Sequence, residues 1–243
     1  GSGNPVGALA LPFFAIGSFA GSYHLVWWTD LGALPVITLP AVFGVGGALA
    51  ITLGGLALLA AIFLWRAAPA HRAVPRRLWI AAVLLAMFAL ANLVVSGQPW
   101  GVVYGLGLWA AKGAQAMGLD LAGSAFWSAA SNAERLRESV LSDVTSLTNI
   151  GMILGAFAVV FWKGGLSFRF SKFPLRAWIA TIVAGFMLGY SARLAFGCNV
   201  GAFFSGISTG SLHGWVWFAA ALGGCGIGIR LRKRLGFEGE HAR

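Results

Sequence analysis

Six apolar runs, each long enough to cross a lipid bilayer, restrict the fold of this chain more than any other feature. A helix needs about 20 mostly apolar residues to cross a hydrocarbon core of roughly 30 Å. Runs of this kind cover residues 6–28, 40–65, 78–95, 144–162, 175–196 and 213–229. Their length favours helices, and no alternation typical of a β-barrel is visible. The sequence therefore predicts an all-α integral membrane protein with about six transmembrane helices.

The composition excludes a soluble fold. Hydrophobic residues make up 58% of the chain and charged residues only 10%, whereas a soluble domain carries roughly 25% charged residues. Too few polar side chains are present to cover a surface in water, so the lipid bilayer must be the solvent for much of it. The net charge of +10 would suggest nucleic-acid binding in a soluble protein. Here we expect no nucleic-acid partner, because the basic residues cluster in short loops between apolar runs.

The basic residues also predict an orientation. Thirteen of the 17 Lys and Arg residues lie in three regions, 66–77, 163–176 and 230–243. Under the positive-inside rule these regions face the cytoplasm. We therefore expect a multi-pass protein with a cytoplasmic C-terminus. The polar stretch 120–143 then lies on the opposite side, where we expect a surface helix or loop.

This orientation has a consequence for two glycine-rich segments. Residues 97–113 and 197–212 are apolar, but each must enter and leave the membrane on the outer face. Both are too short to cross and return as full helices, so we predict two short re-entrant half-helices. Irregular backbone at membrane depth is tolerated where protein buries it or where it lines a polar cavity. Such breaks are a good indication of a transport site.

The second segment carries the stronger candidates for contact with a solute. Cys198 and Asn199 stand at its start, and hydroxyl groups follow at Ser205 and Ser208. Arg193 lies five residues before Cys198, and a charge inside a span is a functional candidate by default. An Arg with N–H and hydroxyl donors suits a small oxyanion. In the first segment, Gln98 and Trp100 are the candidates for a facing partner.

Structural explanations compete with these assignments. Membrane helices commonly use Gly and Ser for packing, Arg193 could extend to the outer interface, and Cys225 suits a small packing residue. The two cysteines lie far apart in the predicted topology, so we expect no disulfide. His24, His71, His213 and His241 show no metal-ligand spacing, and no cofactor motif is present. We therefore predict no metal, no cofactor and no catalytic residue.

Matching glycines at an offset of 207 residues predict an internal repeat. The pairs are Gly3 and Gly210, Gly7 and Gly214, Gly17 and Gly224, and Gly21 and Gly228. The matched helices run in opposite directions, as in an inverted-topology repeat, which many transporters share. Residues 1–77 would then be the remainder of the first repeat, with two helices and a basic linker, and residues 78–243 the second. Because the chain also lacks an initiator Met, we expect that an N-terminal part, with a second re-entrant thiol segment, is missing.

Three stretches of the chain resemble the YeeE/YedE sulfur transport family. They are SARLAFGCNVGAFFSGISTGSLHGWVWFAAALGGCGIG, SGQPWGVVYGLGLWAAKG and SVLSDVTSLTNIGMILGA. The resemblance implies an inner-membrane transporter for thiosulfate or a related sulfur anion, with inverted halves whose short helices meet at mid-membrane. It implies that Cys198 contacts the passing anion, with Gly197, Asn199 and Gly201 forming the turn around it. A cytoplasmic sulfur-carrier protein is the partner that it suggests.

Two other functions stay open at this point. Cys198 could serve a membrane redox protein that transfers sulfur or selenium, although no resolving thiol or base is evident beside it. A passive channel for small anions would also use these residues. We expect a transporter rather than an enzyme.

Overall fold

The computed structural model describes residues 5–32, 34–69, 72–164 and 174–235. In these ranges the elements are helices, with one isolated β-bridge between Thr38 and Ser211. Six helices are long and apolar enough to cross a membrane. They are α1 (Pro5–Asp30), α2 (Leu39–Arg66), α3 (Arg76–Ser96), α6 (Val144–Trp162), α7 (Leu175–Leu194) and α9 (Leu212–Leu235). The predicted all-α, multi-pass membrane protein is confirmed.

Some parts of the predicted pattern fall outside the described ranges. Gly3 of the glycine match lies there, as do His71 and His241. So do portions of the basic regions 66–77, 163–176 and 230–243. The inverted repeat, its division at residue 77 and the orientation in the membrane stay predictions.

Apolar side chains cover the surface of several of these helices. Helix α3 has no buried residue, and in α2 only Leu39 and Ala48 are buried. Phe88 of α3, for example, is 72% exposed. Apolar surface of this extent would be unfavourable in water, but lipid tails cover it without cost.

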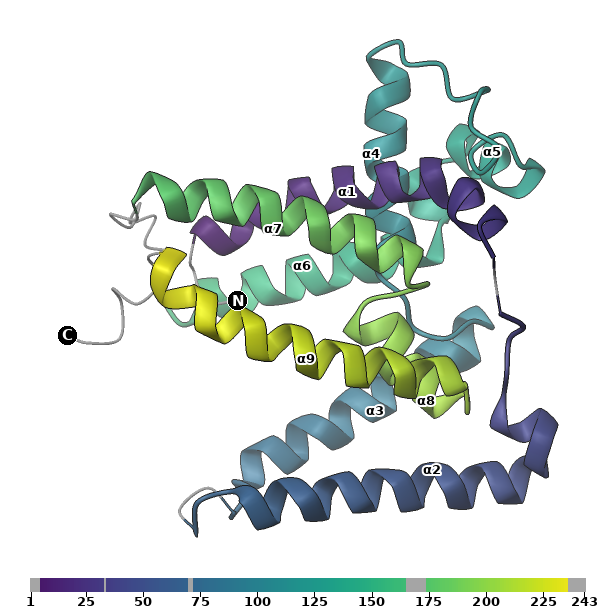
Figure 1. Cartoon of the computed structure of the whole chain (residues 1–243). Coiled ribbons are helices and arrows are strands. Elements are labelled where there is room, and N and C mark those ends of the chain that lie inside the picture. Colours follow the sequence, from purple (N-terminus) through teal and green to yellow (C-terminus); the bar gives the residue numbers. More distant parts are fainter. Residues whose placement is uncertain (1–4, 33, 70–71, 165–173, 236–243) are drawn as a thin grey trace. The chain divides into compact units, whose positions relative to one another are not determined.

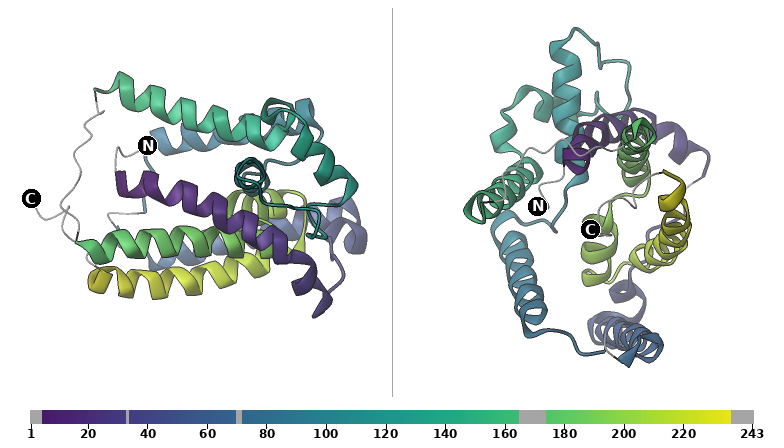
Figure 2. Two further views of the ribbon diagram at one scale, coloured as in Figure 1. Left: turned by 90° about the horizontal axis from the view of Figure 1, so that it is seen from above. Right: turned by 90° about the vertical axis from the view of Figure 1, so that its left-hand side faces the viewer.

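The chain divides into two compact units, and the first comprises residues 1–34, 101–198 and 218–243. Helices α1 and α7 lie side by side along their length in this unit (Figure 1), and two further views show the same pairing (Figure 2). The short helix α4 (Val103–Ala116) packs against α1 and α6. Helix α4 also contributes Leu108 and Ala111 to a small buried core that includes Leu121 and Trp127.

Glycines explain the close approach of α1 and α7. Gly17 and Gly21 of α1 form a GxxxG motif, and Gly185 and Gly189 of α7 form another. A Cβ atom at Gly17 would overlap the Phe186 carbonyl, and one at Gly189 would overlap the Phe14 carbonyl. Small residues of this kind allow two helix backbones to touch, which is how membrane helices gain packing energy without a hydrophobic driving force.

The second unit comprises residues 35–100 and 199–217. Backbone bonds from Leu39 N to Gly210 O (2.7 Å) and from Leu212 N to Ile37 O (3.1 Å) join the start of α2 to the start of α9. Helix α2 also approaches α9 closely, because a Cβ atom at Gly55 would lie 2.6 Å from the Trp215 ring. In this unit, backbone hydrogen bonds therefore join the N-terminal end of α2 to the turn before α9.

Short helices occupy both predicted re-entrant segments. Helix α4 has 14 residues, which at 1.5 Å per residue gives about 21 Å, less than the roughly 30 Å needed to cross. The second segment holds a seven-residue π-helical stretch, η3 (Asn199–Ser205), and a single turn, α8 (Gly206–Ser208). Their lengths suit half-helices. That they enter from the outer side stays a prediction.

The polar stretch 120–143 differs from the simple surface segment that its charges suggest. It does contain a short exposed helix, α5 (Ala130–Arg137), and a 3₁₀ turn, η2 (Val140–Ser142). However, Trp127 is only 1% exposed and Asp143 only 3% exposed. The expectation of a surface helix or loop is therefore wrong for these parts, because Trp127 packs against Leu108 of α4.

Candidate functional site

The first break in the helices, residues 97–102, begins where Gly97 ends α3. Gly97 has φ of +71°, a left-handed conformation that glycine adopts without strain. In the second unit the break contacts η3, because the Ser205 hydroxyl donates to the Trp100 carbonyl at 2.7 Å. The Trp100 ring also meets the Phe204 ring edge to face, with centroids 6.1 Å apart. The structure thus brings Trp100 and Ser205 together.

Gln98 contributes to this break through its backbone. Its carbonyl accepts hydrogen bonds from Asn92 Nδ2 (3.1 Å) and from the Ser96 hydroxyl (3.3 Å), both on α3. Backbone groups inside a membrane protein need such partners, because lipid offers none. The amide of Asn92 therefore has a structural explanation that the sequence pattern did not indicate.

Side chains of the first unit stabilise the start of α4. The Ser18 hydroxyl of α1 donates to the Val103 carbonyl at 2.9 Å. Asn149 Nδ2 of α6 donates to the Val102 carbonyl, also at 2.9 Å. Ser18 and Asn149 are both buried. Polar residues inside apolar runs were the sequence signal for these contacts, but only the structure identifies their acceptors.

We predict that Ser18→Ala destabilises the protein modestly. The substitution removes the donor to the Val103 carbonyl, and losing a hydrogen bond of this kind costs about 1 kcal/mol in a membrane protein. The melting temperature in detergent should fall by about 2–4 °C. Ser191→Ala is the matched control, because Ser191 is exposed and bonds only to the Leu188 carbonyl of its own helix. An equal melting temperature for both variants would contradict the role of Ser18.

The second break begins with a tight turn at the end of α7. Phe196 N donates to the Arg193 carbonyl (3.2 Å) and Gly197 N to the Ala192 carbonyl (2.8 Å). This pair of bonds is the Schellman motif, which normally places glycine at the left-handed position. Here Phe196 holds that position with φ of +52°, and Gly197 follows with φ of +150°. The turn ends α7 shortly before Cys198.

The predicted residues around Cys198 differ in exposure. Gly197 is buried, Cys198 and Gly201 are half-buried, and Asn199 is exposed. Asn199 begins the π-helical stretch η3, and π-helical turns are rare and frequent at functional sites. Ser208 is exposed, and its hydroxyl donates to the Ser205 carbonyl in the same turn. Cys198 is the last residue of one segment of the first unit, and Asn199 is the first residue of a segment of the second.

Arg193 is held between aromatic rings in the first unit. Its guanidinium carbon lies 4.5 Å from the centre of the Phe126 ring and 5.7 Å from that of the Tyr104 ring, both within the range of cation–π attraction. Within the described ranges, its buried Nε has no hydrogen-bond partner and no carboxylate forms an ion pair with it. Arg193 is therefore a half-buried cation without a counterion among these residues.

Sequence reasoning missed Tyr104 and Phe126 as neighbours of Arg193. Tyr104 lies in α4 and Phe126 in the polar stretch, so each comes from a different part of the chain. Aromatic residues are abundant here, at 13% of the sequence, and nothing local distinguishes these two. Only the packing of α4 and of the polar stretch against the end of α7 places them beside the guanidinium.

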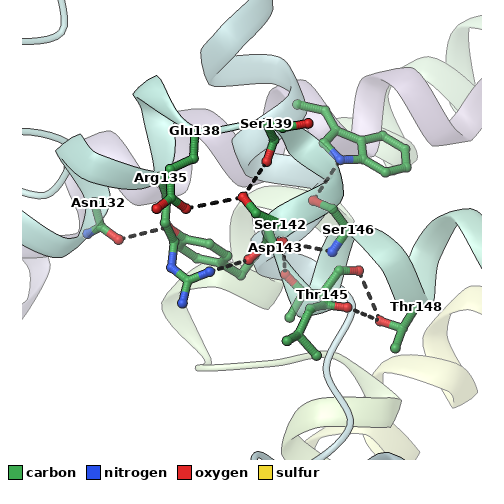
Figure 3. A network of polar contacts seen from close by, with 12 residues as sticks. Asn132, Arg135, Glu138, Ser139, Ser142, Asp143, Thr145, Ser146 and Thr148 are labelled. Atoms are coloured by element: carbon green, nitrogen blue, oxygen red, sulfur yellow. Dashed lines mark hydrogen bonds and ion pairs between the residues drawn. The ribbon is translucent and has the colours of Figure 1, made fainter. Parts of the chain in front are cut away.

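A second arginine nearby is neutralised. Arg135 of α5 pairs with Asp143 at 2.9 Å, as Figure 3 shows. Asp143 also accepts from the Thr145 hydroxyl (2.6 Å) and from Ser146 N (2.7 Å), so its carboxylate caps the start of α6. A carboxylate at a helix N-terminus is stabilised by the free N–H groups. This ion pair thus joins α5 to α6 and uses the charge of Arg135.

Comparison with known proteins gives the family. The sequence profile described as Sulphur transport matches residues 1–227. The chain is 36% identical over 95 residues to a probable transporter YedE of Escherichia coli, and 34% identical over 95 residues to a probable transporter YedE of Salmonella typhimurium. Each match covers 39% of this chain but only 23% of the relative's length. No solved structure gives a significant match. Since the family profile covers most of its length, this chain belongs to the sulphur transport family and is a multi-pass membrane protein of a transporter family.

Proposed function

We propose that this protein takes up thiosulfate or a related small sulfur-containing anion across the bacterial inner membrane. The observation that carries the proposal is the half-buried Arg193, which has no counterion among the described residues and lies five residues before Cys198. An unpaired charge in a low-dielectric environment is costly, so such a site favours a ligand of opposite charge. Membership of a sulphur transport family makes a sulfur anion the natural ligand.

In the proposed mechanism, Arg193 attracts the anion and Cys198 receives it. The thiol donates its S–H to the terminal sulfur or to an oxygen, and no covalent bond needs to form. The remaining candidates are Gly197 of the first unit and, in the second unit, Asn199, Gly201, Ser205, Ser208, Gln98 and Trp100, each proposed as a weak polar contact for the anion. Weak contacts at several sites suit permeation, because the solute must be able to leave each site.

The proposal includes an orientation and a partner. The three basic regions and the C-terminus face the cytoplasm, and the two short breaks face outward. A soluble sulfur-carrier protein would receive the anion on the cytoplasmic side. The relatives are named probable transporters, and this supports the transport step only.

Substituting Arg193 tests the proposal directly. In cells that express the protein from its complete natural gene, Arg193→Gln should lower the uptake of radiolabelled thiosulfate by about 10- to 100-fold, because a charge-assisted hydrogen bond contributes roughly 1.5–3 kcal/mol. Arg193→Lys should keep part of the uptake, since it retains the charge but loses the planar donor set. Arg176→Gln on the same helix is the control, because Arg176 is exposed. Wild-type uptake by Arg193→Gln would exclude Arg193 as the anion site.

Two further assays separate the alternatives. In a channel for small anions, added sulfate and selenite would reduce thiosulfate uptake in proportion to their concentrations. In a selective transporter they would not. A membrane enzyme would transfer sulfur from thiosulfate to a thiol in the purified protein, without any flux. Either result would replace the proposed function.

A further inference from the structure

Asn132 of α5 connects the two aromatic residues whose rings contact Arg193. Its Oδ1 accepts a hydrogen bond from the Tyr104 hydroxyl at 2.9 Å, and its Nδ2 donates to the Phe126 carbonyl at 2.8 Å. Asn132 is half-buried, and these two bonds use opposite ends of its amide. One side chain therefore joins α4, which carries Tyr104, to the loop that carries Phe126.

The direction of both bonds follows from the chemistry of the groups. A backbone carbonyl only accepts, so the NH₂ end of Asn132 must face Phe126 and the oxygen must face Tyr104. The Tyr104 hydroxyl is therefore the donor, and its proton is committed to Asn132. These two hydrogen bonds leave the Asn132 amide only one orientation. They also hold the Tyr104 ring in place through its hydroxyl group.

The buried Trp127 ring packs against the same two rings. Trp127 is 1% exposed, and its ring lies 5.0 Å from the Phe126 ring, edge to face, and 6.3 Å from the Tyr104 ring. Both rings thus contact the buried Trp127 ring as well as the Arg193 guanidinium. The two hydrogen bonds of Asn132 add a polar connection between the Tyr104 hydroxyl and the Phe126 backbone.

Arg135 does not take over the role of Arg193 in this cluster. Its guanidinium carbon lies 6.0 Å from the Tyr104 ring centre, but it is paired with Asp143 at 2.9 Å. In Figure 3 the Arg135 side chain points toward Asp143. Asn132 lies on α5, the same helix as Arg135. The cation near Tyr104 that stays unpaired among the described residues is Arg193.

We propose that Asn132 is a positioning residue that sets the place of Arg193 through the Tyr104 and Phe126 rings, and so sets the affinity for the transported anion. The part concerning affinity rests on the proposed function. The part concerning position does not. The polar stretch 120–143 is then a determinant of the anion site rather than a passive connection between spans.

The position of Arg193 is tested first, without transport. Purified protein in detergent is treated with phenylglyoxal, which modifies accessible arginines, and the modification rate of each arginine is measured by peptide mass spectrometry. Asn132→Ala should raise the rate at Arg193 by about fivefold or more, because the Tyr104 hydroxyl and the Phe126 backbone carbonyl lose the side chain that joins them, and the two rings beside the guanidinium are held less firmly. Arg176, exposed at the other end of α7, is the internal reference and should not change. An unchanged rate at Arg193 would overturn the proposal.

Tyr104→Phe provides a conservative second variant. It keeps the ring and removes only the hydroxyl that donates to Asn132, so folding is little affected. The rate at Arg193 should rise in this variant as well, by less than in Asn132→Ala. If the two residues act through one hydrogen bond, the double variant should show less than the product of the two single effects. Strictly multiplicative effects would contradict the connection through Asn132.

Transport kinetics then test the affinity. Asn132→Ala should raise the KM for thiosulfate by about tenfold while Vmax stays within about twofold, since a displaced cation weakens binding more than flux. Ser142→Ala is the control in the same stretch, because its exposed hydroxyl bonds only to Glu138 and Ser139. A changed phenylglyoxal rate with an unchanged KM would overturn the affinity claim. If the wild type shows no thiosulfate uptake at all, the proposed function fails. The phenylglyoxal modification rates then still test whether Asn132 sets the position of Arg193.

Discussion

If Cys198 donates to the anion as proposed, Cys198→Ala should lower thiosulfate uptake by about 10- to 100-fold, because a hydrogen bond to a charged group contributes roughly 1.5–3 kcal/mol. Cys198 is half-buried at the end of the turn that closes α7, and the positive φ angles of Phe196 and Gly197 fix where it emerges. Cys198→Ser should fall between alanine and the wild type, because a hydroxyl donates but is smaller than a thiol. Uptake is measured in cells with matched amounts of protein in the membrane.

Cys225→Ala is the matched control for this prediction. Cys225 is an exposed thiol of α9, and it is the only other cysteine in the sequence. Its replacement should leave uptake unchanged, and a thiol-directed reagent should then inhibit the Cys225→Ala protein as strongly as the wild type. Thiosulfate should slow that inhibition. Full uptake by Cys198→Ser would show that the thiol has no specific role, and protection at Cys225 instead would reassign the site.

Gly189→Leu should prevent the correct packing of α1 against α7. Even a Cβ atom at Gly189 overlaps the Phe14 carbonyl and comes within 2.8 Å of Ser18 N. Because the clash is with backbone, no side-chain movement relieves it, and the helices must separate. Overpacking of this kind costs on the order of 3 kcal/mol or more. We expect a strongly reduced yield of folded protein, measured by size-exclusion chromatography in detergent and by the melting temperature.

Gly155→Leu is the control that separates packing from helix propensity. Gly155 lies in α6, where a Cβ atom meets nothing within 4 Å among the described residues. Leucine is a better helix former than glycine, so this variant should be as stable as the wild type or slightly more so. If Gly155→Leu and Gly189→Leu destabilise the protein equally, the close contact of α1 and α7 is not the reason for the glycine. Gly17→Leu should behave like Gly189→Leu, because its Cβ atom would overlap the Phe186 carbonyl.

The spans could be predicted because their signal is local. Each transmembrane helix is a continuous apolar run, so its existence follows from length and hydropathy alone. The predicted bounds 78–95 and the observed α3 (Arg76–Ser96) differ by a turn or less. The glycine-rich breaks were also readable, since Gly97 and Gly197 interrupt runs that would otherwise continue. For the same reason Arg193 and Cys198 stood out as unusual residues in or beside a span.

The polar stretch 120–143 was misjudged because charge density is a poor guide to burial at this site. Glu134, Arg135, Arg137 and Glu138 suggested a surface segment. Yet Trp127 in the same stretch packs into the core beneath α4, and Asp143 is buried because it pairs with Arg135 and caps α6. A single charged segment can be exposed at one turn and buried at the next when partners are available.

The sequence by itself determined the membrane class, the six spans, the two breaks and the candidates Arg193 and Cys198, because these depend on residues close together in the chain. The tertiary structure alone decided which groups meet: Ser205 with Trp100, Ser18 with Val103, and the Phe126 and Tyr104 rings with Arg193. These partners lie 67 or more positions apart in the sequence. Contacts of that range arise from helix packing, which no local pattern encodes.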